Sequence, residues 1–277
     1  MDSTYNIKII SENDSISIIN SVSKTFRVIC NNEEYIYSAE DITAVLIKTM
    51  DTGPIVEDMY AEVYIYDTIY IIISESRLFK TLILDTIGSL VSLNLKLFIE
   101  ASTYHFNKTF VLYQIDDVDI EYEDSDDKKI AVLEASIKLI QTGDCSAELC
   151  GFVFAVMSFC PMYLLYSKGK FGDELVNISA INKNLIPIYT TLDRCPNEEL
   201  FERRRHNSSS YVKLLVSGNN DAVVNFNSDC PVKISLQQLQ NILLPLVLLR
   251  EETENKRLVD SKQRKKKELL KKLFRRK

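Results

Sequence analysis

Two carboxylates beside a glycine-proline pair have the spacing that best fits acid/base or ligand chemistry in this chain. Asp51 and Asp58 flank Gly53 and Pro54, on what the pattern predicts to be a turn between two strands. As a functional unit, the four residues would bind a ligand or move a proton between the carboxylates. The alternative is a plain Gly-Pro turn in which Asp51 accepts hydrogen bonds from backbone amides. We favour the plain turn and keep Asp51, Gly53, Pro54 and Asp58 as a candidate ligand site.

Nucleophilic and metal chemistry lack the partners that they need. His105 and His206 are the two histidines, and the six cysteines include one close pair, Cys145 and Cys150, with four residues between them. A zinc knuckle has two residues between its cysteines, and no second pair completes four ligands. A Cys–His nucleophile whose members meet only in the folded chain stays open, although nothing local activates a thiol. We predict a non-enzymatic protein with no catalytic residue, no metal and no cofactor.

The strongest charge feature is the C-terminal segment 256–277. It holds twelve lysines and arginines against two acids, a net charge of +10, so residues 1–255 carry −16 and the whole chain −6. Its apolar residues recur at helical spacing, which predicts a basic amphipathic helix. The residues predicted to bind a partner are Lys265, Lys266, Lys267, Leu269, Leu270, Lys271, Lys272, Leu273, Phe274, Arg275 and Arg276.

A basic amphipathic helix has several uses. It can dock in a protein groove, lie on an anionic membrane or contact nucleic-acid phosphates. The alternative is a solvated helix, or a tail folded back on an acidic segment. We predict a protein partner, with a membrane surface or nucleic acid as the other occupants of the tail, and no small-molecule substrate.

The acidic segment is residues 116–127, in which eight of twelve positions are Asp or Glu. Such a density repels itself and buries no face, so it predicts a solvated linker. A calcium site is the sharper alternative, but the glycine and glutamate spacing of an EF-hand is missing. The predicted organisation is an N-terminal domain over 1–115, an acidic linker over 116–128, a second domain over 129–250 and a basic helical tail over 251–277.

Composition and the N-terminal sequence indicate a globular cytosolic protein. Hydrophobic residues make up 46% and charged residues 26% of the chain, the usual globular balance. The first ten residues lack the basic start and apolar region of a secretory signal. The longest apolar stretch, 149–166, is too short for a membrane span. We therefore expect a cytoplasmic protein with reduced cysteines.

The periodicity of the first domain predicts strands followed by helices. Hairpin-connected strands are expected at 7–10, 15–19, 25–30 and 34–37, and a further pair at 62–66 and 68–73 turns at Asp67. Two helices follow, one capped by Ser76 and reaching residue 89, the other over 93–102. A strand over 108–114 closes a domain of α+β type.

The second domain is predicted to begin with a helix from residue 128 that ends before Gly143. Strands follow at 152–159, 162–166, 185–190 and 221–225, with a helix over 192–205 whose basic end is 203–206 and a helix or buried run over 211–215. Ser235 caps a helix that Pro245 kinks or ends. The predicted fold class is α+β, two mixed domains with mainly antiparallel sheets plus a C-terminal basic helix.

Three short motifs in the second domain resemble the SseB family of small bacterial cytoplasmic proteins. They are the strand 186–192, the element 211–215, and the strand 222–225 with the helix from Ser235 behind it, within about residues 149–246. The motif positions are Pro187, Thr190, Thr191 and Asn225. The family has Asn-Pro where this chain has Asn225-Phe226, and commonly Ser at the position of Thr191. The first domain also resembles small bacterial domains with a Thr-x-Asp-x-Gly-Pro element, here residues 49–54.

These resemblances imply a compact α+β interaction module without an established catalytic site. They also imply an immunity or accessory protein of a secretion or toxin system, whose acidic body would cover a basic toxin surface. The alternative is a peripheral adaptor that uses its basic tail to contact an anionic membrane or nucleic acid. Deleting residues 256–277 separates the two, because only the adaptor needs the tail.

Overall fold

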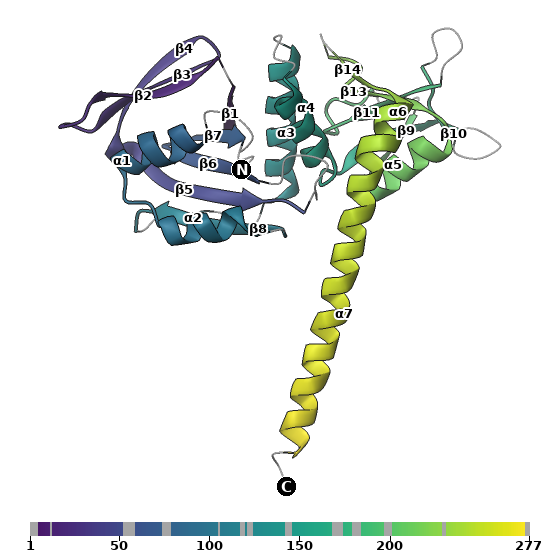
Figure 1. Ribbon diagram of the computed structural model, residues 1–277. Helices are drawn as coiled ribbons and strands as arrows, with labels where there is room; N and C mark the ends of the chain where they lie inside the picture. The colour runs from purple at the N-terminus through teal and green to yellow at the C-terminus, as the bar shows by residue number, and fades with distance from the viewer. Residues whose placement is uncertain are drawn as a thin grey trace.

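β-Branched and aromatic residues near the N-terminus form a five-stranded sheet with the order β1-β7-β6-β5-β8 (Figure 1). The computed structural model describes residues 5–11, 13–51, 59–73, 79–104, 106–116, 120, 124–141, 146–167, 174–178, 184–196, 201–228 and 231–274, without the side chains of 264, 266 and 268–274. The strands are β1 (Asn6–Ile10), β5 (Ile42–Thr49), β6 (Met59–Ile65), β7 (Thr68–Ile73) and β8 (Lys108–Gln114). All pairs in this sheet are antiparallel except β1 with β7.

A second, three-stranded antiparallel sheet stands beside the first. It contains β2 (Ser15–Asn20), β3 (Thr25–Cys30) and β4 (Glu33–Ser38), and a 3-10 turn at Ala39–Asp41 leads into β5. The predicted hairpins are confirmed for these three strands. They are wrong for β1, which pairs in parallel with β7 rather than with its neighbour in sequence. Strand β5 is implied by the predicted turn after residue 51, but no range was predicted for it; it lies inside the sheet between β6 and β8.

Helical segments cover one face of the five-stranded sheet. They are a π-helical segment η3 (Thr81–Ile87), α1 (Gly88–Leu90) and α2 (Leu95–Ser102). The Asn94 side chain caps α2 by accepting the Leu97 N–H at 3.3 Å. Both helices predicted between residues 76 and 102 are confirmed in the described part, and their apolar residues pack with β3 and β7 in one buried cluster.

Two helices, α3 (Asp126–Gln141) and α4 (Ala147–Met157), stand between the five-stranded sheet and a further sheet (Figure 1). The helix predicted from residue 128 is confirmed as α3. The strand predicted over 152–159 is wrong, because residues 147–157 are helical. Ser146 caps α4 by accepting the Leu149 N–H at 3.2 Å. Packed between two sheets, α4 has few polar positions, so its sequence lacks the periodicity of a surface helix.

The last sheet has the order β10-β9-β11-β13-β14, with β12 on the other side of β9. Its strands are β9 (Met162–Ser167), β10 (Glu174–Leu175), β11 (Leu185–Tyr189), β12 (Phe201–His206), β13 (Asp221–Val224) and β14 (Val232–Ile234). The helix predicted over 192–205 is wrong at its basic end, because all six residues of β12 pair with β9. The Arg204 guanidinium lies 4.4 Å from the centroid of the Tyr166 ring on β9, a cross-strand contact that favours the strand.

A long helix ends the chain and projects away from the body (Figure 1). It follows α5 (Ser208–Ser217), α6 (Leu236–Gln238) and the π-helical segment η4 (Leu239–Leu243), and is itself α7 (Leu244–Phe274). Ser235 and Gln238 form the capping box of this helical run. Of the two predicted effects of Pro245, a kink or an end of the helix, the second is wrong, because α7 continues to Phe274. Pro245 has no N–H to donate, and the wider turns of η4 directly before it remove the need for an ordinary i−4 bond at that point.

One hydrophobic cluster joins the two larger sheets through α3 and α4. It includes Tyr60 and Ile71 of the first sheet, Phe152 of α4, and Leu164 and Ile188 of the last sheet. The predicted α+β class with mainly antiparallel sheets is confirmed. Residues on either side of 116–128 contribute to this one cluster. The predicted division into two domains stays a prediction.

Candidate functional site: a buried ion cluster and a projecting basic helix

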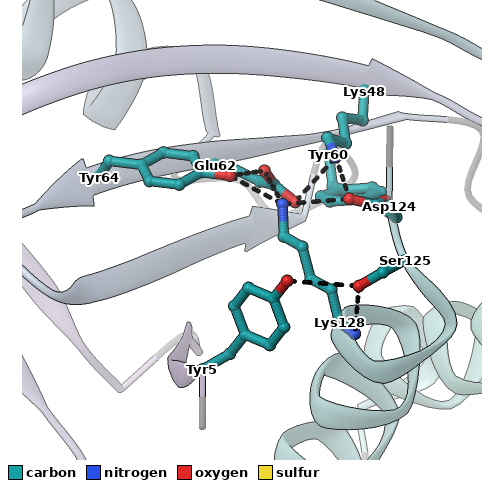
Figure 2. Close-up of polar contacts among 8 residues, drawn as sticks. All are labelled: Tyr5, Lys48, Tyr60, Glu62, Tyr64, Asp124, Ser125 and Lys128. Atoms are coloured by element: carbon teal, nitrogen blue, oxygen red, sulfur yellow. Dashed lines mark hydrogen bonds and ion pairs between the residues drawn. The ribbon is translucent and has the colours of Figure 1, made fainter. Parts of the chain in front are cut away.

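Four charged side chains meet between the five-stranded sheet and the start of α3 (Figure 2). The Lys128 Nζ lies 2.8 Å from Glu62 Oε2 and 3.1 Å from Asp124 Oδ1. The Lys48 Nζ also pairs with Asp124, and lies 3.5 Å from Glu62 Oε1. The side chains of Glu62 and Lys128 are 0% and 1% exposed, so this is a buried cluster in which two positive charges balance two negative ones.

Three tyrosines complete the surroundings of the ion cluster. The Tyr64 hydroxyl donates to Glu62 Oε2 at 2.8 Å and accepts from the Lys128 ammonium at 2.7 Å. The Tyr60 hydroxyl donates to Asp124 Oδ2 at 3.3 Å. Tyr5 contacts none of the four charges, but its hydroxyl lies 3.3 Å from Ser125 Oγ, directly before α3 (Figure 2). These bonds matter because a buried charge is costly unless its remaining hydrogen-bonding capacity is used.

Strand register and helical spacing place the four charges. In the β5–β6 ladder, Leu46 pairs with Glu62 and Lys48 with Tyr60, so Lys48 and Glu62 are diagonal neighbours on one face. Asp124 and Lys128 are four residues apart at the start of α3, where such side chains are also neighbours. The cluster therefore ties the middle of the first sheet to α3.

The charges act on one another's pKa values. Burial would raise the pKa of Asp124, but the adjacent charges of Lys48 and Lys128 outweigh it and hold that pKa below its ordinary value. Burial would lower the pKa of Lys128, but Glu62 and Asp124 outweigh it and raise that pKa. For Lys48, burial prevails over the same two carboxylates and lowers the pKa. Burial also raises the pKa values of Tyr60 and Tyr64.

The pKa of Asp124 predicts acid sensitivity. Because that pKa is lower in the folded chain than its unfolded value of about 3.9, the stabilisation is complete above pH 4 and is lost as the pH falls through the folded value. We expect Asp124→Asn to cost about 2 kcal/mol at pH 6, the value of a charge-assisted hydrogen bond. Urea unfolding of both proteins at pH 6 and pH 2.5 measures this difference, which should shrink at the lower pH. A constant difference would contradict the assignment.

The linker prediction assumed that the acid-rich segment is solvated throughout. This is wrong for two of its residues. Asp124 is 17% exposed and paired, and Ile120 is 6% exposed. Lys128, four residues on, and Lys48, which the fold brings from β5, offset the local repulsion at Asp124. The calcium alternative stays untested, because Asp117, Asp119, Glu121 and Glu123 lie outside the described residues; the described part contains no group of three or more His, Cys, Asp or Glu that could hold a metal ion.

The predicted ligand turn is described only at Asp51. Its backbone N–H donates to Asn107 Oδ1 at 2.7 Å, and its carboxylate is buried, with no hydrogen-bond partner for Oδ2 among the described residues. Gly53, Pro54 and Asp58 lie outside the described residues. Whether Asp51 and Asp58 form a pair stays a prediction.

The structure brings two of the four SseB-like motif positions together. The Asn225 side chain lies at the end of β13 and accepts the Thr190 N–H at 3.1 Å, at the end of the parallel strand β11. Asn225 has a φ of 51°, a left-handed conformation that asparagine tolerates. The Thr190 hydroxyl donates to Glu134 of α3, whose carboxylate also accepts from Arg194 at 2.7 Å.

These contacts tie the strand ends to α3, and they use the polar atoms that a ligand would need. Thr191 is half-buried and is not among these contacts. Pro187 is buried in β11 and faces Val223 across the ladder. The geometry at this motif is that of a structural joint between the last sheet and α3.

His206 is hydrogen-bonded within the fold, and Cys160 is buried in the core. His206 lies between Tyr166 and Ser210, with Nε2 and Nδ1 each 2.9 Å from a hydroxyl. Burial, aided by Arg204, lowers its pKa. Cys160 is fully buried, and burial raises the pKa of its thiol. His105, Cys145 and Cys230 lie outside the described residues, so the Cys–His and zinc alternatives stay untested.

The predicted basic tail is helical as far as Phe274. Residues 254–274 are the part of α7 that lies beyond its base, and they are called its outer half below. Every described side chain from Glu254 to Lys267 is exposed, and Leu258 and Val259 are 57% and 53% exposed. A helix of 21 residues from 254 to 274 is about 30 Å long. Among the described helices, none is long and apolar enough to cross a membrane.

Sequence reasoning found the tail but missed the ion cluster. Lys48 ends the apolar run of β5 and Glu62 lies in an alternating strand, so each had the appearance of an ordinary strand residue. A usable signal was present, since charges inside strands that are otherwise buried need partners. The partner of Glu62, Lys128, is 66 positions further along the chain, so local spacing could not identify it.

Comparison of this chain with family models, with curated proteins and with solved structures gives no match.

Proposed function

We propose that this protein is a non-enzymatic cytosolic interaction protein that holds an acidic protein partner with the outer half of α7. The observation that carries the proposal is the projecting helix itself, whose described side chains are exposed from Glu254 to Lys267. An isolated helix is marginally stable in water, and leucine and valine side chains that remain exposed contribute no hydrophobic stabilisation. A partner that covers this helix would supply the missing stabilisation.

The inner end of α7 gives the projecting part a fixed base. Leu246 and Val247 are each 1% exposed in the core. The Arg250 guanidinium donates to the Ser158 carbonyl at 2.6 Å and to Ser208 Oγ at 3.2 Å. Because the base is held by the body, the helix is presented in one direction, which lowers the entropy cost of binding.

The chemistry of α7 favours an acidic protein groove. Lys262 follows the exposed Leu258 by four residues, so the two lie on one helix face. A groove with both apolar side chains and carboxylates fits this mixed face better than hydrocarbon does. Two copies of the tail would bring together two net charges of +10, which disfavours self-association along residues 256–277.

A second version of the interaction proposal combines the SseB-like character of residues 149–246 with the immunity or accessory role. The net charge of −16 on residues 1–255 supports an acidic body that binds a basic toxin domain. That version needs no tail. The peripheral adaptor, in which α7 meets an anionic membrane or nucleic acid, is the competing version.

Binding by truncated and charge-reduced chains tests the proposal. We expect a partner purified with the full chain to lose measurable binding when residues 256–277 are deleted. The triple variant Lys265→Gln, Lys266→Gln, Lys267→Gln should weaken binding about tenfold or more at low salt, since each lost charge contact costs a fraction of a kcal/mol or more. Lys233→Gln, which removes one exposed charge of the body, is the control.

Each alternative result has a distinct meaning. Equal binding by the truncated chain would assign the contact to the acidic body and support the immunity version. Tail-dependent sedimentation with vesicles that contain phosphatidylserine, without a protein partner, would support the adaptor. The deletion removes the contact of Arg257 with the Phe106 ring and otherwise exposed side chains, so we expect the body to stay folded.

A further inference from the structure

A pocket of about 620 Å³ opens where the end of β5, the start of β8, α3, α4 and α7 meet. Its size lies within the range of small-molecule sites, roughly 300–1,000 Å³. Lys48, Tyr60 and Asp124 of the ion cluster in Figure 2 form part of its wall. The pocket meets the exposed part of α7 only at Glu254, its first residue, and none of residues 256–277 lines it, so it shares no side chain with the basic tail.

Positive charge predominates among the lining side chains. Lys48, Lys108, Lys129 and Arg250 line the pocket against two acids, Asp124 and Glu254. The acids that pair with Lys108 and Lys129 are Glu100 and Asp126, and neither is a lining residue. The lining therefore has a net charge of +2.

One of these cations has the freedom to turn toward a ligand. The Lys129 side chain is 30% exposed and its ammonium is 3.6 Å from Asp126, a loose pair. Weak surface pairs of this kind are readily exchanged. Lys108, in contrast, is held 2.9 Å from Glu100 and over the rings of Tyr104 and Phe110. Lys48 and Arg250 are held by the ion cluster and by the Ser158 carbonyl.

A neutral donor and an apolar wall complete the pocket. Asn107 Oδ1 accepts the Asp51 N–H, which fixes its amide so that the NH₂ end is a donor. Met50, Val132, Val156 and Phe159 supply apolar surface. A ligand matched to this lining has anionic oxygens at one end, where charge-assisted hydrogen bonds form, and an apolar group at the other.

We propose that this pocket binds a small organic anion, an apolar group that carries one phosphate or carboxylate, with Lys129 on the anion and the Asn107 amide as a neutral donor. Binding would join the first sheet, α3 and the base of α7 through one ligand.

NMR titration of the full ¹⁵N-labelled chain with phenyl phosphate and with benzoate tests the proposal and distinguishes phosphate from carboxylate. We expect saturable shifts of the amides of Asn107 and Lys129 for at least one anion, and at least tenfold weaker binding of phenol, which lacks the charge. Lys129→Gln should weaken the anion about tenfold, the loss of one charge-assisted hydrogen bond. The matched control is Lys138→Gln, an exposed lysine of the same helix that does not line this pocket.

Three results would overturn the proposal. These are the absence of saturable shifts with both anions, equal affinity for phenol, and equal effects of the Lys129 and Lys138 substitutions. The amide spectrum of each variant shows directly whether it is folded, and Lys129→Arg, which keeps the positive charge, provides a second test because it should keep the affinity for the anion.

Discussion

Replacing Lys128 by methionine is expected to cost about 3–5 kcal/mol of unfolding free energy, the usual effect of removing one partner of a buried ion pair. Methionine keeps most of the volume but leaves Glu62, which is 0% exposed, with Lys48 at 3.5 Å as its remaining positive neighbour. Tyr64 would also lose the ammonium that donates to its hydroxyl. Urea unfolding near pH 7 measures the loss.

A neighbouring lysine and a double variant provide the controls. Lys129→Met removes a positive charge from the next residue, whose side chain is 30% exposed, and should cost no more than about 1 kcal/mol. Glu62→Gln combined with Lys128→Met removes one charge of each sign and leaves Lys48 with Asp124. We expect the double variant to be more stable than the sum of the single effects by about 1–3 kcal/mol. Equal costs for Lys128→Met and Lys129→Met would contradict the role of the cluster.

The sequence predicted the elements whose pattern is local. The apolar stripe of α3, the Ser235 cap and the strand pair that turns at Asp67 are set by side chains within one or two turns or strand lengths, and each is confirmed. The basic tail was equally visible, because twelve like charges are concentrated in 22 residues. Fold class follows from such elements, since strands and helices are segregated along this chain.

The elements that sequence reasoning misassigned are those that tertiary contacts decide. α4 has apolar residues around most of its circumference because it packs between two sheets. β12 is a charged segment that a propensity argument places in a helix, yet it pairs along its full length with β9. The ion cluster belongs to the same group, since Glu62 and Lys128 are far apart in sequence and each meets its partner only in the fold.

The shared core suggests that the two predicted domains unfold together. Phe152 of α4 is 0% exposed, and its ring meets the Tyr60 ring of β6 edge-on at 5.3 Å between centroids. The same buried cluster continues to Leu164 and Ile188 of the last sheet. A cavity at Phe152 would therefore remove packing contacts from both halves of the chain.

We expect Phe152→Ala to cost about 3–5 kcal/mol, as buried phenylalanine truncations do, and to lower the unfolding midpoints of both halves equally. The chain has no tryptophan, so Tyr66→Trp and Phe226→Trp, at positions 65% and 42% exposed, place one fluorescent reporter in each half. Phe106→Ala, at a position 47% exposed, is the control and should cost about 1 kcal/mol. If the two reporters gave separate midpoints and Phe152→Ala moved only the second, the division into domains over 1–115 and 129–250 would hold. If the two midpoints coincide and Phe152→Ala lowers both by the same amount, α3 and α4 join the two sheets into one cooperative unit. The base of α7 then unfolds only with the whole chain.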